Sequence, residues 1–128
     1  DSQGAHATRY SVCKAYRAAG EDHIVLISDA TVHEEAGEVR DINFNERDQL
    51  SGSRLCLAMA AKNFRSFIGA DVRVTFKCAS TNSAKAMGLY GEVGSIDAGK
   101  LANLVFVDEN FTVHNVIFKG AALPEIRA

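Results

Sequence analysis

Hydrophobic residues follow two different periods in the first part of the chain. Between residues 8 and 19 they recur at helical spacing, which predicts a helix that ends at Gly20. Residues 23–28 contain four consecutive large aliphatic side chains. Such a run is typical of a strand buried on both faces, as in a parallel sheet. A helix, a short turn and a buried strand make half of a βαβ unit. The helical positions are Tyr10, Cys13, Tyr16 and Ala19.

The middle of the chain changes from an acidic stretch to a second amphipathic pattern. Residues 31–49 are rich in Asp and Glu, with 39–44 as a candidate short strand, and we interpret the stretch as a solvated connector. A helix is predicted from a cap at Ser51 or Ser53 through Ile68. Its expected inner face consists of Cys56, Met59, Ala60, Asn63, Phe64 and Phe67, and Gly69 is its stop.

Two shorter helices are predicted next. Residues 72–79, with a cap at Asp71, place Val72, Thr75, Phe76 and Ala79 on one helical face, although residues 72–76 also have the β-propensity of a strand. We predict a helix there. Thr81 or Asn82 is expected to cap another helix over 83–87, closed by Gly88.

The pattern becomes β-rich after Gly91. Residues 104–107 and 113–118 predict two strands joined by a turn at 108–110, and Pro124 marks the tail. Two strands alone are marginally stable, so this hairpin is expected to join a larger sheet. We therefore predict two units, residues 1–90 and residues 91–128.

Bulk properties exclude several classes of protein. The chain has 128 residues, fewer than the roughly 250 of a complete (β/α)₈ barrel, and it begins without Met, so we expect a piece of a longer protein. A net charge of −2 gives no reason to expect nucleic acid or an anionic membrane as a partner. No apolar run approaches the roughly 18 residues of a membrane span, and no signal peptide is visible. Three widely spaced cysteines suggest small buried hydrophobes in a reducing cytoplasm, namely Cys13, Cys56 and Cys78.

Asp29 follows the aliphatic run and is the leading candidate for chemistry. Catalytic side chains of α/β barrels lie at the C-terminal ends of the strands. From its position alone, Asp29 could cap a helix, bind a cation or act as a base. Beside a divalent metal, a carboxylate can take a proton from metal-bound water and return it to a leaving amine.

Three segments together resemble a known family. The sequence Ser28-Asp29-Ala30 stands where the family has Thr-Asp-Ala at the end of its eighth barrel strand, and Leu50-Ser51-Gly52-Ser53 matches a loop that opens its eighth helix. Residues 94–104 follow the pattern Gly-x-Ile-x-x-Gly-Lys-x-Ala-Asp/Asn-Leu, for which we expect a structural role only. The family is the N-acetylglucosamine-6-phosphate deacetylases of the amidohydrolase superfamily, and the resemblance is to their C-terminal third.

The resemblance implies a fold of the α/β class. Residues 1–90 would be the C-terminal part of a metal-dependent-hydrolase (β/α)₈ barrel, and residues 91–128 would supply strands of a small β-sandwich domain. The implied reaction hydrolyses N-acetylglucosamine 6-phosphate to acetate and glucosamine 6-phosphate, in amino-sugar catabolism. A related amidohydrolase acting on N-acetylgalactosamine 6-phosphate or a cyclic amide is the alternative, as is a non-catalytic binding module.

The resemblance also assigns site residues. Asp29 would be the general base and acid next to the metal. The family's Asp-Gly-x-His motif, whose His contacts the sugar and the reacting carbonyl, corresponds to Gln3, Gly4, Ala5 and His6, with Gln3 in place of the Asp. A frayed terminus is the plain alternative for His6. Substrate contact is implied for Leu50, Ser51 and Gly52; taken alone, this loop is a helix cap.

The metal ligands of the family, a Glu and two His, lie upstream of the segment matched here, as does its phosphate-binding Arg. We therefore expect a divalent metal, zinc or iron, in the full-length parent and none in this chain, which should be inactive alone. The parent is expected to be a homodimer that binds a small amino-sugar phosphate. One further group could bind a metal but is interpreted as a solvated loop: His33, Glu34, Glu35 and Glu38.

Overall fold

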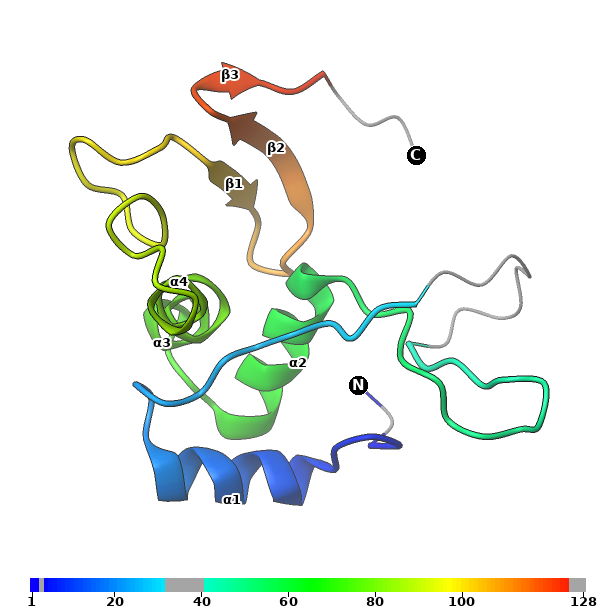
Figure 1. The fold of residues 1–128 in the computed structure, drawn as a ribbon. Helices are drawn as coiled ribbons and strands as arrows, with labels where there is room; N and C mark the ends of the chain where they lie inside the picture. Colours follow the sequence, from blue (N-terminus) through cyan, green and yellow to red (C-terminus); the bar gives the residue numbers. More distant parts are fainter. Residues whose placement is uncertain (3, 32–40, 125–128) are drawn as a thin grey trace.

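The structure is a computed structural model, and it describes residues 1–2, 4–31 and 41–124. It is a mixed α/β arrangement in which helices lie below a small antiparallel sheet in the view of Figure 1. Its elements in chain order are α1 (Arg9–Ala19), α2 (Leu57–Ile68), α3 (Val72–Phe76), the π-helical turn η1 (Lys77–Thr81), α4 (Asn82–Ala86), β1 (Leu104–Val107), β2 (Val113–Phe118) and β3 (Ala121–Ala122).

Helix α1 confirms the first predicted helix. The Thr8 hydroxyl accepts a hydrogen bond from the Ser11 amide at 3.1 Å and so caps its N-terminus. Gly20 ends the helix with a φ of 75°. The helix packs on α2 through an edge contact between the rings of Tyr16 and Phe64, whose centroids are 5.9 Å apart. The predicted inward face is less covered than expected, because Tyr10 is 74% exposed.

Residues 23–28 are extended but do not form a strand buried on both faces, so that prediction is wrong for the described structure. Ile27 is 70% exposed, whereas its neighbours Ile24 and Leu26 are half-buried. Alternate residues of an extended segment point to opposite sides. One side is held by the Leu26 amide, which donates to the Cys78 carbonyl at 3.0 Å. Among the described residues, no strand lies alongside this segment to cover the other side.

Helix α2 begins later than predicted, at Leu57, and neither Ser51 nor Ser53 caps it. Ser53 is drawn away because its backbone pairs with residues 29–31 in a parallel bridge to Ala30. The buried face of α2 confirms Ala60 and Phe64 of the prediction but differs at other positions. It includes Ala60, Ala61 and Phe64, whereas Cys56 and Met59 are exposed.

Residues 72–86 form one continuous helical stretch, which confirms the choice of helix over strand for residues 72–79. The predicted cap at Thr81 or Asn82 is wrong, because both residues have helical backbone angles inside the stretch. Asn82 instead serves tertiary packing. It is 3% exposed, and its side-chain amide donates to the carbonyls of Glu21 and Ile24, each at 2.7 Å.

Strands β1 and β2 match their predicted bounds, and β3 extends the sheet by two residues. Leu104 pairs with Ile117, and the register shifts between Phe106 and Val107. The turn between β1 and β2 docks on the helices through Phe111. This side chain is 6% exposed, and its ring centroid lies 5.7 Å from that of Phe76.

The surface is larger than that of a typical monomer of this size. The chain exposes 9315 Å², whereas a folded monomer of its mass exposes roughly 6,600 Å². Large apolar side chains in several parts of the chain contribute to this exposed surface, including Ile27, Ile96 and Phe118. Within the described residues, no helix combines the length and the apolar character needed to span a bilayer.

The cysteines differ from one another in burial. Cys78 is fully buried, as predicted, and Cys13 is half-buried. Cys56 is exposed, so its prediction as a buried hydrophobe is wrong. The reason is its position immediately before α2, where the chain has just left its contact with residues 29–31.

Candidate active site

Two predicted site segments meet in the structure. The Ser53 amide donates to the Asp29 carbonyl at 2.8 Å, and the Thr31 amide donates to the Ser53 carbonyl at 2.9 Å. The Ser53 hydroxyl also donates to the Ser28 carbonyl. These bonds fix the end of the extended segment beside the loop formed by residues 50–53.

Asp29 presents its carboxylate to solvent. The residue is exposed and has a φ of 50°, in the left-handed region that Asp tolerates better than most residues. Such a conformation persists when neighbouring contacts hold the backbone, and the bond from Ser53 to the Asp29 carbonyl is one of them. Among the described residues, none donates a hydrogen bond to the Asp29 carboxylate. The side chain is therefore open to solvent on the described part of the chain.

The loop residues Leu50, Ser51 and Gly52 lie directly beside this segment. The Ser51 carbonyl accepts a hydrogen bond from the Thr31 hydroxyl at 3.0 Å. Gly52 has a φ of 66°, and a β-carbon built on it would lie 2.6 Å from Cγ2 of Thr31. Only glycine fits this close approach. Leu50 is 46% exposed and forms an antiparallel bridge with Phe44.

Asn43 is central to this arrangement, and the sequence analysis did not identify it. It is 5% exposed. Its side-chain amide nitrogen lies 2.9 Å from the Ser53 carbonyl, 2.8 Å from Oγ1 of Thr31 and 3.2 Å from the Thr31 carbonyl. The sequence signal for its burial was the candidate short strand at residues 39–44, in which Ile42 and Phe44 flank Asn43.

Residues 41–43 are buried, so the interpretation of residues 31–49 as a solvated connector is wrong for this part. Asp41 is 7% exposed, and its carboxylate accepts hydrogen bonds from the amide of Ser2 at 2.5 Å and from the side chain of Asn63 at 3.5 Å. The possible metal-binding group that was interpreted as a solvated loop lies outside the described part of the chain: His33, Glu34, Glu35 and Glu38.

The N-terminal segment makes its own local structure. The Asp1 carboxylate accepts hydrogen bonds from the amides of Ala5 and His6, each at 2.9 Å. Gly4 has a φ of 74°, and the side chain of His6 is exposed. Within the described residues, no hydrogen bond joins residues 4–6 to Asp29 or to residues 50–52. Gln3 lies outside the described residues.

The described residues do not form a metal centre. No three His, Cys, Asp or Glu side chains among them come together in a way that could hold an ion. Asp29 is thus a single carboxylate at the edge of the two segments. Any chemistry that needs a coordinated metal would require further ligands.

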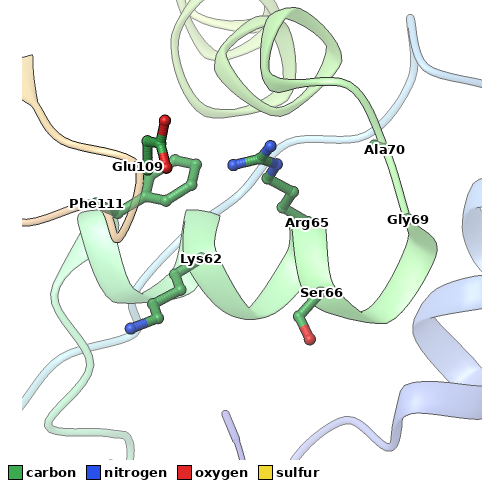
Figure 2. Close-up of a pocket in the computed structure, with 7 residues that line it drawn as sticks. All are labelled: Lys62, Arg65, Ser66, Gly69, Ala70, Glu109 and Phe111. Atoms are coloured by element: carbon green, nitrogen blue, oxygen red, sulfur yellow. The ribbon is translucent and has the colours of Figure 1, made fainter.

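A separate open pocket of about 440 Å³ lies between the second half of α2 and the turn before β2. Figure 2 shows the Arg65 side chain directed toward Glu109 and Phe111, whereas Lys62 and Ser66 point to the other side of the helix. The pocket contains none of the predicted site residues. Its lining residues are Lys62, Arg65, Ser66, Gly69, Ala70, Glu109 and Phe111.

The glycine-rich pattern at residues 94–104 is held together by Lys100. The Lys100 ammonium group donates to the Tyr90 carbonyl at 2.5 Å and to the Ser95 hydroxyl at 2.6 Å. It also lies 3.6 Å from the centroid of the Tyr90 ring, and the side chain is 12% exposed. These contacts close a local loop, in keeping with the structural role predicted for the pattern.

Comparison with known proteins identifies relatives of this arrangement. The profile of the Amidohydrolase family matches residues 9–123. An N-acetylglucosamine-6-phosphate deacetylase from Lysinibacillus sphaericus is 28% identical over 127 residues, covering 90% of this chain and 33% of that protein. The chain thus spans about a third of the length of this relative.

Solved structures show the same similarity. The N-acetylglucosamine-6-phosphate deacetylase of Thermotoga maritima superimposes with a TM-score of 0.77 at 30% identity, over 93% of this chain and 36% of that one. The enzyme of the same name from Pasteurella multocida gives a TM-score of 0.84 at 23% identity, over 95% of this chain and 35% of that one. The second match supports the fold alone.

Proposed function

The chain belongs to the amidohydrolase family, and we propose that it is the C-terminal part of an N-acetylglucosamine-6-phosphate deacetylase. The observation that carries the proposal is the exposed Asp29 carboxylate, held at the end of an extended segment by backbone bonds to the loop of residues 50–53. Relatives of that name match most of this chain in sequence and in structure. The substrate of the complete protein would be a small amino-sugar phosphate.

In this proposal residues 1–90 complete a (β/α)₈ barrel and residues 91–128 belong to a small β-sandwich. The exposed side of residues 23–28, with Ile27 at its centre, supports this arrangement. A barrel strand is covered by neighbouring strands and by side chains of the barrel interior. A segment that lacks those neighbours would show one uncovered side, as residues 23–28 do.

Asp29 would carry the proton transfers of amide hydrolysis. Its carboxylate would take one proton from the attacking water as the carbon–oxygen bond forms at the acetamide carbonyl. The resulting carboxylic acid would then give that proton to the amine nitrogen as the carbon–nitrogen bond breaks. Acetate and the amino sugar phosphate leave, and Asp29 returns to its carboxylate form. His6 and the loop residues Leu50, Ser51 and Gly52 would contact the sugar.

Amidohydrolases are generally metal-dependent, and we propose that the complete protein uses a divalent metal, zinc or iron. Among the described residues, no three candidate ligands come together to hold it, so further ligands would come from other parts of the complete protein. The chain by itself is accordingly expected to be inactive. A homodimeric assembly and a cytoplasmic location are further predictions for the complete protein.

The test is acetate release by the complete protein, purified with zinc or iron supplied. N-acetylglucosamine 6-phosphate should be turned over faster than N-acetylgalactosamine 6-phosphate, and a cyclic imide should be inert. Faster turnover of either competitor would replace the proposed substrate. A folded, metal-supplied protein that hydrolyses none of the three would contradict the proposed function and favour a non-catalytic module.

A further inference from the structure

We propose that Asn43 is a positioning residue that couples the end of the extended segment, which carries Asp29, to the loop of residues 50–53. The inference rests on the proposed function for its catalytic part, whereas the coupling itself is a property of the fold. Asn43 belongs to neither of the segments it joins.

The side-chain contacts of Asn43 link the two segments directly. Its amide nitrogen has acceptors on both: the Ser53 carbonyl at 2.9 Å, and Oγ1 and the carbonyl of Thr31 at 2.8 and 3.2 Å. Because two of these acceptors are backbone carbonyls, only an amide N–H₂ suits this position. An oxygen there would face two carbonyl oxygens without a proton between them.

The backbone of Asn43 adds contacts to the loop. Its carbonyl accepts a hydrogen bond from the Ser51 amide at 2.9 Å, and its amide donates to the Gly52 carbonyl at 3.3 Å. Asn43 therefore holds three consecutive loop residues and the end of the extended segment. Its burial, with 5% of the residue exposed, excludes water as a ready substitute for these partners.

The coupling reaches Asp29 through one further bond. The Asn43 side-chain amide donates to the Ser53 carbonyl, and the Ser53 amide in turn donates to the Asp29 carbonyl at 2.8 Å. The φ of 50° at Asp29 is sparsely populated for residues other than glycine and needs such support. Loss of the Asn43 amide should let Asp29 move relative to the substrate loop. A displacement of about 1 Å in a reacting group is enough to lower turnover strongly.

The first arm of the test measures the coupling itself, without any substrate. In the complete protein, Asn43→Asp should raise amide hydrogen exchange at Thr31 and Ser53 about tenfold or more, because a carboxylate cannot donate to their carbonyls. The matched control is Asn45→Asp. Asn45 lies two residues away, and among the described residues its side-chain amide donates to Gln49 alone, at 3.3 Å. Unchanged exchange at Thr31 and Ser53 in Asn43→Asp would overturn the proposal.

The second arm measures catalysis. Turnover per folded molecule should fall about tenfold or more in Asn43→Asp and remain near wild type in Asn45→Asp. Adding Asn43→Asp to Asp29→Asn should cause a smaller further loss than Asn43→Asp causes alone, because part of its effect acts through Asp29. A purely structural effect would add in full to the loss caused by Asp29→Asn, and that result would overturn the positioning role.

A milder variant keeps the test decisive if Asn43→Asp does not fold. Thr31→Val removes one acceptor of the Asn43 amide and also the hydrogen bond from the Thr31 hydroxyl to the Ser51 carbonyl. It should give smaller changes of the same sign in exchange and turnover than Asn43→Asp. No change in either quantity would count against the coupling. If the wild-type protein hydrolyses no substrate, the proposed function fails, whereas the exchange measurement still decides whether Asn43 couples the two segments.

Discussion

Gly52 lies against Asp29 so closely that a β-carbon on Gly52 would be 2.8 Å from the Asp29 carbonyl oxygen. The contact joins a loop glycine to the backbone of Asp29, 23 positions earlier in the chain. Local sequence alone gives no reason for such an approach. It results from the parallel bridge between Ala30 and Ser53.

Gly52→Ala should therefore destabilise the protein and impair the site. The left-handed backbone costs a non-glycine residue about 1–2 kcal/mol, and the clash with Thr31 and the Asp29 carbonyl adds to it. The matched control is Gly69→Ala, because Gly69 has a φ of 65° but no atom within 4 Å of its β-carbon position. Chemical denaturation should show a larger loss for Gly52→Ala. Equal losses would mean that the contact with Asp29 relaxes without cost.

Asp29→Asn should lower turnover by about 10²–10⁴-fold, the usual contribution of a positioned general acid–base group. Stability should change little, because the side chain is exposed and, among the described residues, receives no hydrogen bond. Asp48→Asn is the control, since Asp48 is also exposed and has a φ of 55°. Acetate release by both variants checks the prediction. Near-normal activity of Asp29→Asn would exclude the proton-transfer role.

Lys100→Met should lower stability without changing turnover per folded molecule. The substitution removes hydrogen bonds to Tyr90 and Ser95 and a close contact with the Tyr90 ring, which together predict a loss of about 1–2 kcal/mol. Lys85→Met is the comparison, because the Lys85 ammonium group also faces the Tyr90 ring but at a greater distance, 5.2 Å. The loss of stability in Lys85→Met should therefore be smaller than in Lys100→Met. Thermal unfolding and steady-state kinetics separate the two effects. A turnover loss specific to Lys100→Met would revise the structural assignment.

The turn before β2 should lose stability in acid through Asp108. Hydrogen bonds from the backbone of Thr112, then from His114 and the backbone of Asn110, lower the pKa of Asp108 below its ordinary value of 3.8. Since the folded state then holds the proton less tightly than the unfolded state, the stabilisation is complete above pH 3.8. It disappears as the pH falls from there through the folded-state pKa.

Asp108→Asn removes this titration and should flatten the acid dependence. Amide exchange at residues 113–117, compared between wild type and variant at each pH, checks it because the intrinsic pH effect cancels. The difference in amide exchange between wild type and Asp108→Asn should shrink as the pH falls below 3.8. A constant difference across that range would show that Asp108 does not titrate differently in the folded state.

Local pattern predicted most of the secondary structure correctly. The helical spacing of residues 8–19, the stop at Gly20 and the β-rich runs of residues 104–107 and 113–118 act over a few neighbouring positions. Such signals are contained in the sequence around each element. The predictions failed where a residue bonds to a segment distant in sequence. Ser53 bonds to residues 28–31 and does not cap α2. Asn82 bonds to residues 21 and 24 and does not cap a helix.

The sequence by itself determined the family resemblance, most of the helix positions, the strands β1 and β2, and Asp29 as the candidate residue at the end of an aliphatic run. Only the tertiary structure decided which segments meet there. Asn43 joins Thr31 to Ser53 by side-chain hydrogen bonds across 12 and 10 positions, and Asp41 is buried within a stretch of acidic appearance. Hydrogen-bond geometry and burial depend on the folded path of the chain, and no local period encodes them.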